Sequence, residues 1–258
     1  MSEIKNKTVL ITGATSGIGK SCAKVFAREG AKIVLAARRE KLLSEVAEEL
    51  KREYNAQVFS VVMDVKKHSS VKKAIDSLSG EWRNIDILIN NAGMARGLEK
   101  VQEGTIEGWD ETIDTNIKGV LYVTREVLPG MIERQNGHII FLGSTAGHDV
   151  YPGGSVYCAT KFAVKALAQA TRIDVLDKYV KVTSVDPGMV ETNFSNVRFP
   201  DDPERAANVY KGITPLTPDD VAETILFAAS RPRHVNLNQI IMTPIAQAQS
   251  NFIIKKPV

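Results

Sequence analysis

The chain has 258 residues, of which 43% are hydrophobic and 24% are charged, and its formal net charge is +3. These are ordinary values for a globular protein that buries a substantial core. Basic residues alternate with acidic ones, as in ARREKLLSEVAEELKRE at 37–53, which argues against the basic stripe of a nucleic-acid-binding protein.

Short segments rich in Val, Ile and Leu predict seven β-strands. In chain order they are 7–12, 32–37, 57–63, 86–90, 137–143, 180–186 and 238–242. Several are continuous apolar runs, which is typical of strands covered on both faces. Helical patterns between them occupy 17–29, 39–53, 69–81, 108–135, 154–177 and 218–230. This alternation predicts an α/β fold with one doubly wound parallel sheet, in a single domain spanning 1–258.

The first strand leads into the glycine-rich segment TGATSGIGK at 12–20. Glycines permit a tight turn, and the N-terminus of the following helix offers free N–H groups to a pyrophosphate. The spacing G-x-x-x-G-x-G differs from the G-x-G-x-x-G fingerprint, and alone the turn could be a tight crossover. Its position after the first strand favours a dinucleotide site. The residues assigned to it are Gly13, Thr15, Ser16, Gly17, Ile18 and Gly19.

The second strand ends in LAARRE at 35–40, without the acid that commonly binds the ribose 2′-hydroxyl in NAD-selective sites. Arg38 and Arg39 stand there instead. An arginine fork pairs with a phosphate dianion that an acid would repel. The alternative is that both arginines only begin a solvated helix. The missing acid favours NADP(H) over NAD(H) as the cofactor.

A tyrosine and a lysine lie four residues apart in SVYCATKFA at 155–163. On a helix, Tyr157 and Lys161 would share one face, and the simplest interpretation is a surface pair. The functional interpretation is that the ammonium lowers the pKa of the phenol from about 10 toward the range useful for acid–base catalysis. The spacing alone does not decide between them.

Segment 191–217 interrupts the alternation because it is polar, contains three prolines and is too long for an ordinary connection. Insertions of this kind are usually lids or binding loops, so we expect a substrate loop here. The C-terminal tail at 244–258 has no clear periodicity. It either packs on a neighbouring subunit or frays, and the sequence favours neither.

The two cysteines, Cys22 and Cys158, lie in segments with a helical pattern, so no disulfide framework or metal-binding spacing follows. The four histidines are scattered, and we expect no metal site. Segment 1–6 is too polar for a signal peptide, and no apolar run approaches the length of a membrane span. The sequence predicts a cytoplasmic protein with a small-molecule substrate and no membrane or nucleic-acid partner.

Several motifs in order resemble the short-chain dehydrogenase/reductase family, from about residue 6 to 245. They are TGATSGIG at 12–19, NNAG at 90–93, Asn116, Ser144, YCATK at 157–161 and PGMVET at 187–192. The resemblance implies a Rossmann-type sheet, with Tyr157 as general acid/base, Ser144 bound to the substrate oxygen, and Lys161 bound to the nicotinamide ribose. It implies that Asn116 holds a helix kink and a water that links the lysine to solvent. The family is commonly tetrameric, so we expect a homotetramer.

The resemblance also extends the expected cofactor site beyond the glycine turn. It places Asp64 and Val65 against the adenine, and Asn91, Ala92 and Gly93 along the ribose. It places Pro187, Gly188, Val190 and Thr192 at the nicotinamide. For Asp64 the alternative is a turn residue that only ends the third strand.

Three further segments look like the NADP-dependent 3-hydroxy acid dehydrogenases, which act on serine, allo-threonine and 3-hydroxyisobutyrate. They are ETNFSNVRF at 191–199, LTPDDVAE at 216–223 and RPRHVNLNQIIMTP at 231–244. A 3-hydroxy acid needs a partner for its carboxylate, and the candidates are Arg198, Arg96 and His148. Arg198 leads because an arginine on a lid can close over a small anion.

Two other functions remain open from the sequence. The stretch HDVYPGGSVY at 148–157 departs from the resemblance along the expected substrate wall, which leaves substrate size open. A carbonyl reductase for bulkier ketones or aldehydes is therefore one alternative. The other is a catalytically silent sensor that binds the cofactor, against which the intact Ser144, Tyr157 and Lys161 argue.

Overall fold

The seven predicted strands all form in the computed structural model, which describes residues 3–255, and they make one parallel sheet. They are β1 (Thr8–Thr12), β2 (Lys32–Ala37), β3 (Val58–Val62), β4 (Ile87–Asn90), β5 (Gly137–Leu142), β6 (Val180–Pro187) and β7 (Gln239–Met242). Their order is β3-β2-β1-β4-β5-β6-β7. The chain winds in opposite directions from β1 and from β4, and ligands bind at such a switch point, beyond the carboxyl ends of the strands. The predicted fold class is confirmed.

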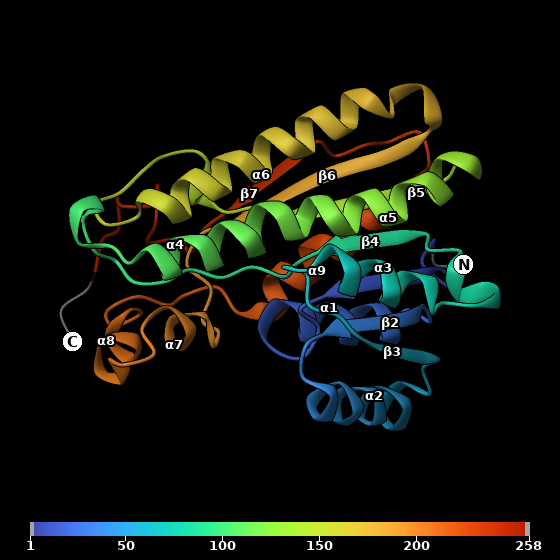
Figure 1. The fold of residues 1–258 in the computed structure, drawn as a ribbon, viewed down its shortest axis with the longest axis horizontal. Helices are drawn as coiled ribbons and strands as arrows, with labels where there is room; N and C mark the ends of the chain where they lie inside the picture. The colour runs from blue at the N-terminus through green and yellow to red at the C-terminus, as the bar shows by residue number, and fades with distance from the viewer. Residues whose placement is uncertain (1–2, 256–258) are drawn as a thin grey trace.

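Helices cover both faces of the sheet (Figure 1). On one face lie α1 (Gly17–Arg28), α2 (Glu40–Tyr54) and α9 (Pro218–Ala229). On the other lie α3 (His68–Asp76), α5 (Val120–Glu133) and α6 (Ser155–Asp174). Within residues 3–255, no helix combines the length and apolar character that crossing a bilayer requires.

Strand β1 explains the continuous apolar runs of the sequence. Val9 and Ile11 pack with α1, α2 and α9, whereas Leu10 between them packs with the helices of the opposite face. Successive side chains of a strand point to opposite faces, so a strand with both faces covered is apolar at every position. The sheet is therefore a rigid platform for its carboxyl edge.

The predicted helix 108–135 is divided into three consecutive segments. They are α4 (Ile106–Ile113), a π-helical segment (Asp114–Gly119) and α5. A π-helical turn adds a residue to the turn without changing the hydrophobic character of the sequence, so the pattern does not reveal it. The other predicted helices form with shifted ends: 69–81 ends as α3 at Asp76, and 154–177 ends as α6 at Asp174.

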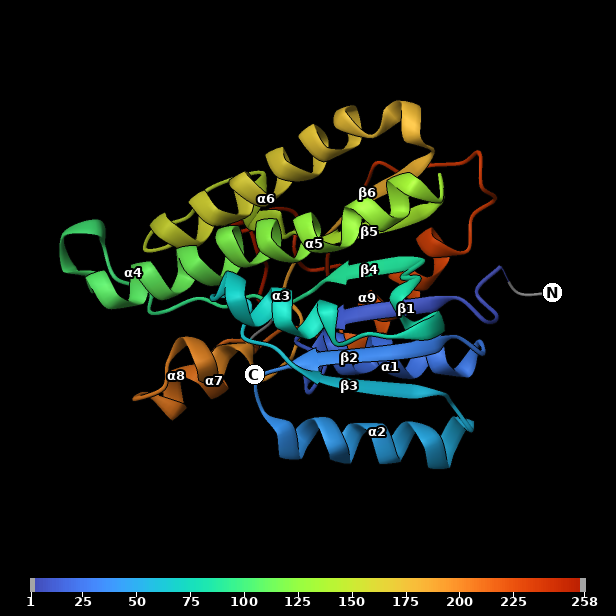
Figure 2. The same cartoon turned by 45° about the vertical axis from the view of Figure 1, so that its right-hand side comes forward.

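Segment 191–217 contains two short helices, α7 (Phe194–Arg198) and α8 (Pro203–Asn208). Asp202 begins α8 as its N-cap, because its side chain accepts a hydrogen bond from Arg205 N, and Pro203 follows in the first turn. Figure 2 shows the strands pointing toward the end of the molecule where α4, α7 and α8 lie. The segment thus lies at the carboxyl edge of the sheet.

The C-terminal tail returns across this edge without a helix. Gln247 and Ile253 form an isolated antiparallel bridge, and the side chains of Phe252 and Ile254 are exposed. The last part of the predicted tail, 256–258, lies outside the described residues, as do residues 1 and 2 of the predicted N-terminal segment. Both interpretations of the tail stay open.

A buried histidine lies in β5, in the interior of the sheet. The Nε2 atom of His138 is 2.8 Å from Thr183 Oγ1, and its Nδ1 has no hydrogen-bond partner among the described residues. Burial, reinforced by the charge of Lys181, lowers the pKa of His138 to about 3. The folded protein therefore holds this imidazole neutral.

We expect His138 to make the protein acid-sensitive. Because its folded pKa lies below its ordinary value of about 6.5, its contribution is fully present above pH 6.5 and is lost as the pH falls toward 3. The loss approaches about 1.4 kcal/mol per pH unit. In thermal melts between pH 6.5 and 4, the midpoint of His138→Asn should fall less steeply than that of the wild type. His234→Asn, at an exposed position, should keep the wild-type slope.

Candidate active site

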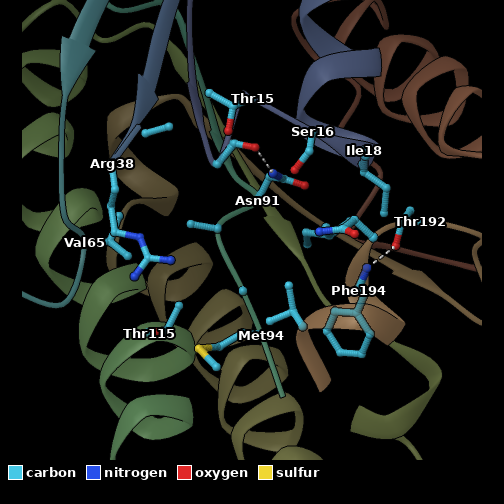
Figure 3. Close-up of a pocket in the computed structure, with 18 of the residues that line it drawn as sticks. Thr15, Ser16, Ile18, Arg38, Val65, Asn91, Met94, Thr115, Thr192 and Phe194 are labelled. Carbon is cyan, nitrogen blue, oxygen red and sulfur yellow. Dashed lines mark hydrogen bonds between the residues drawn. The ribbon is translucent and has the colours of Figure 1, made fainter. Parts of the chain in front are cut away.

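A cavity of about 360 Å³ lies at the carboxyl edge of the sheet, beside the switch between β1 and β4 (Figure 3). It extends from the glycine turn to the end of β5 and the start of α6. The predicted residues that line it are Gly13, Thr15, Ser16, Gly17, Ile18, Arg38, Arg39, Asp64, Val65, Asn91, Ala92, Gly93, Arg96, Ser144, Tyr157, Lys161, Pro187, Val190 and Thr192. Five predicted residues lie elsewhere, namely Gly19, Asn116, His148, Gly188 and Arg198.

The glycine turn adopts a backbone that requires glycine at two positions. Gly13 has a φ of +67° and Gly17 a φ of +50°, both in the left-handed region. Gly19 does not face the cavity: a Cβ there would overlap the carbonyl oxygen of Gly13, so it permits the helix to pack against the turn. Asn91 stabilises the turn, because its Nδ2 donates to Thr12 O at 2.8 Å and to Gly13 O at 3.3 Å.

Two arginines lie at the outer end of the cavity. Arg38 and Arg39 are both exposed, and Nη2 of Arg39 donates to Thr15 Oγ1 at 3.1 Å. The side chain of Arg38 extends into the cavity on the side of Val65 (Figure 3). Both are therefore available to an anionic group bound beside the turn.

Asp64 is a turn residue that also lines the cavity. Its Oδ1 accepts a hydrogen bond from Lys66 N at 3.2 Å, which makes it a turn residue at the end of β3. The same residue also lines the cavity, with Val65 beside it.

Hydroxyl and ammonium groups meet at the inner end of the cavity. Ser144 and Tyr157 both line this end of the cavity. Ser144 also caps a short 3₁₀ segment, accepting from Ala146 N at 3.1 Å. Lys161 is buried; its Nζ donates to Leu142 O at 2.9 Å and lies 5.8 Å from the centroid of the Tyr157 ring. The structure thus brings the predicted Ser, Tyr and Lys together.

Burial opposes the pKa tuning expected from the sequence. It raises the pKa of the Tyr157 phenol, while the hydrogen bond with Ser144 and the charge of Arg198 lower it. Burial also lowers the pKa of Lys161 to about 8, against the opposing effect of Asp186. In the protein alone, the net effect of its surroundings is therefore to raise the pKa of the phenol. The ammonium directs its hydrogen bond to a carbonyl rather than to the phenol.

Asn116 lies in the π-helical segment with both ends of its amide satisfied. Its Oδ1 accepts from Met94 N at 2.9 Å, and its Nδ2 donates to Met94 O at 2.8 Å and to Thr160 Oγ1 at 3.0 Å. It is buried and does not line the cavity. It ties the segment after β4 to α6 at the residue before Lys161, which is a positioning role.

The two candidate arginines link segment 191–217 to the chain that follows β4. Arg96 Nη1 donates to Val197 O at 2.5 Å, and Arg198 Nε donates to Gly97 O at 2.7 Å. Arg198 also donates to the Tyr151 hydroxyl at 3.2 Å. Arg198 lies on a second cavity of about 290 Å³, which Arg96 and the Tyr157 ring also line. Helix α7 is therefore fastened over the tyrosine.

His148 lines neither of these two cavities. Its position therefore differs from the sequence prediction, which made it a candidate partner for the substrate carboxylate. Its Nε2 lies 2.7 Å from a carboxylate oxygen of Asp186, behind the strand end. His148 is thus one of the polar groups that surround this buried carboxylate, together with Ser184 and Gln239.

Sequence reasoning missed three residues around the tyrosine. Phe194 of α7 packs on Tyr157 with ring centroids 5.5 Å apart, Tyr151 binds Arg198, and Asp186 ends β6. PGMVET, directly followed by NF, could have pointed to Phe194. No spacing rule signals the other two.

A sequence model of the family described as short chain dehydrogenase matches residues 7–203. The chain is 44% identical over 249 residues to the NADP-dependent 3-hydroxy acid dehydrogenase YdfG of Salmonella typhi, covering 96% of this chain and 99% of that protein. It is 41% identical over 245 residues to the serine 3-dehydrogenase of Rhizobium radiobacter, covering 95% and 96%.

Among solved structures, the closed form of a serine dehydrogenase complexed with NADP+ matches with a TM-score of 0.90 and 41% identity. The match covers 97% of this chain and all 100% of the other. The structure of the serine dehydrogenase of Escherichia coli matches with a TM-score of 0.81 and 39% identity, covering 93% and 99%.

Proposed function

Because the chain belongs to the short-chain dehydrogenase family, we propose that it transfers a hydride between NADP(H) and the hydroxyl-bearing carbon of short 3-hydroxy acids. Serine, allo-threonine and 3-hydroxyisobutyrate are the substrates to test first. One observation carries the proposal: a single cavity has a glycine turn and two arginines at one end, and Ser144, Tyr157 and Lys161 at the other.

The residues of the cavity fit a dinucleotide. The glycines of the turn leave room for the pyrophosphate beside the start of α1, and Arg38 and Arg39 supply charge for a 2′-phosphate. Asp64 and Val65 would hold the adenine, and Asn91, Ala92 and Gly93 the ribose. Pro187, Val190 and Thr192 would hold the nicotinamide, while Gly188, packed against Gln247, would support them from behind. When bound, the nicotinamide supplies the hydride acceptor or donor.

The protein's part is to hold and move a proton. Tyr157 takes the proton from the substrate hydroxyl in oxidation and returns it in reduction. Ser144 donates a hydrogen bond to the substrate oxygen, where charge develops. Lys161 supplies a positive charge that favours the phenolate and binds the ribose, and Asn116 keeps the lysine in place through Thr160.

We further propose that Arg198 binds the substrate carboxylate. It is carried by α7, and its guanidinium lies 5.6 Å from the centroid of the Tyr157 ring. The contact with the Tyr151 hydroxyl orients it there. A planar guanidinium beside the Tyr157 ring suits a substrate carboxylate two carbons from the hydroxyl-bearing carbon. Arg96 is engaged by Glu111 and is assigned to holding the lid.

A substrate panel tests this proposal. We expect steady-state oxidation of 3-hydroxy acids with NADP+, and much slower oxidation of neutral alcohols of the same size. Turnover of bulky neutral ketones with NADPH, without turnover of the acids, would instead identify a carbonyl reductase. The second cavity beside the tyrosine offers space for such substrates. Binding of NADPH without any turnover would identify a sensor.

Arg198→Ala is expected to raise the KM for a 3-hydroxy acid by about 10–100-fold, the effect of losing one or two charge-assisted hydrogen bonds. The KM for a neutral alcohol should change less than threefold. Arg205→Ala is the matched control, since Arg205 stacks on Phe199 of the same segment at 4.5 Å. An equal rise for acids and neutral alcohols would mean that Arg198 only fastens the lid.

We also propose a homotetramer that works in the cytoplasm. The exposed face of α6 carries Phe162 and Ile173, and Leu121 is exposed on α5, which supports pairing of these helices between subunits. Both cysteines are free, as in a reducing compartment. The molar mass in sedimentation equilibrium tests the assembly.

A further inference from the structure

Asp186, at the end of β6, is a carboxylate with 1% of its surface exposed. Burying a carboxylate is costly unless hydrogen-bond donors surround it. Three donors do so here. The Ser184 hydroxyl and Gln239 Nε2 donate to it, the latter at 2.7 Å, and His148 Nε2 lies at 2.7 Å. The surrounding donors therefore compensate the burial of Asp186.

This carboxylate packs directly against the segment that carries the active-site groups. A Cβ added to Gly143 would overlap Asp186 Oδ1, so only a glycine allows this approach. Gly143 stands between Leu142, whose carbonyl accepts the hydrogen bond from Lys161, and Ser144. Asp186 thus packs against the segment that binds Lys161 through the Leu142 carbonyl and that carries Ser144.

Charges around Asp186 come from several elements. From α6, Lys161 is buried, and Lys165 Nζ lies 3.3 Å from His148 Nδ1. His148 therefore lies between the Lys165 ammonium and the Asp186 carboxylate, with one ring nitrogen toward each. After His148, Asp149 faces the tail and accepts from Ser250 N. Burial lowers the pKa of Lys161, and the charge of Asp186 opposes that effect.

We infer that Asp186 is a positioning residue of the active site. Its buried carboxylate, held by His148 and Gln239, fixes the Leu142–Ser144 segment, whose Leu142 carbonyl binds the Lys161 ammonium. The inference rests on the proposed function, in which that ammonium supports Tyr157 and the nicotinamide ribose. It also gives His148 a role in place of the substrate contact expected from the sequence.

Asp186→Asn tests the inference through the pH dependence of kcat/KM. Without the carboxylate, Lys161 should lose its proton at lower pH, so the ratio of variant to wild-type kcat/KM should fall at least tenfold between pH 6 and 9. Asp149→Asn is the matched control, because it removes the same charge from the adjacent loop; its ratio should stay constant. A merely structural role would give Asp186→Asn a ratio that is reduced equally at every pH, and this result would overturn the inference.

Two further measurements keep the test decisive. Gln239→Lys, at an exposed position beside Asp186, places a cation on the carboxylate without opening a cavity and should give the same falling ratio if Asp186→Asn does not fold. The Kd for NADPH, measured by nicotinamide fluorescence, should weaken in both variants over the same alkaline range. An unchanged Kd profile together with a flat ratio would sink the inference.

The inference and the proposed function can fail separately. If the wild type oxidises neutral alcohols but no 3-hydroxy acid, the substrate assignment is wrong, and the pH comparison is made with the neutral alcohol. If the wild type oxidises 3-hydroxy acids and the ratio stays flat, the inference about Asp186 alone is wrong.

Discussion

Tyr157→Phe is expected to lower kcat/KM for the oxidation of a 3-hydroxy acid by about 10²–10⁴-fold, the usual contribution of a general acid or base. The substitution removes one oxygen atom, the phenol oxygen of a side chain that lines the cavity together with Ser144. No other change of shape is needed, and Phe194 still packs on the ring. NADPH formation followed by absorbance measures the loss, and the Kd for NADPH should change less than threefold.

The direction of the reaction gives a second measure of the same residue. Because burial raises the pKa of Tyr157, the phenol is protonated at neutral pH in the protein alone, which suits it to donate a proton in reduction. Oxidation needs the phenolate. Below the Lys161 pKa of about 8, we therefore expect kcat/KM for oxidation to rise with pH relative to that for reduction, and this difference to disappear in Tyr157→Phe.

Tyr179→Phe is the control for these experiments, since that tyrosine is exposed and lies just before the start of β6, whereas the cavity is at the end of this strand. It should keep wild-type rates in both directions. A Tyr157→Phe enzyme with more than a tenth of the wild-type rate would show that another group carries the proton.

The sheet could be predicted because each strand encodes its own environment. In β1, Leu10 faces one layer of helices and Val9 and Ile11 the other, so burial on both faces is visible as an unbroken apolar run. The π-helical segment around Asn116 could not be predicted, because an inserted residue leaves the hydrophobic pattern unchanged. The sequence marks this segment only by polar residues, such as Asn116, within a helical pattern.

The active site was predictable where it depends on the backbone of the carboxyl edge. The glycine turn, Ser144 after β5 and the pair on α6 meet because parallel strands all end at one edge. Contacts that depend on side-chain rotamers were not predictable. His148 follows Ser144 closely, yet it turns to Asp186, 38 residues along the chain, because the buried carboxylate needs a donor. For the same reason, the sequence did not reveal that burial raises the pKa of Tyr157.

Arg38→Gln is expected to lower kcat/KM with NADP+ by about 10–100-fold, the effect of removing charge-assisted hydrogen bonds to one phosphate. Arg38 lines the cavity and is exposed, so the bonds it makes are not needed to hold the fold. The rate with NAD+, which lacks that phosphate, should change less than threefold. Initial rates with each cofactor at a saturating 3-hydroxy acid measure both effects.

Arg39→Gln is the matched control, because it removes the same charge from the next residue. Arg39 already donates to Thr15, so part of its hydrogen-bonding capacity supports the turn, and we expect a loss with NADP+ below tenfold. If a general electrostatic attraction from this edge of the sheet bound the phosphate, the two variants would instead lose kcat/KM with NADP+ equally. If the wild type used NAD+ and NADP+ equally well, neither arginine would select between the two cofactors. The difference between the two variants therefore separates a directed hydrogen bond from a general field, and the structure favours the directed bond from Arg38.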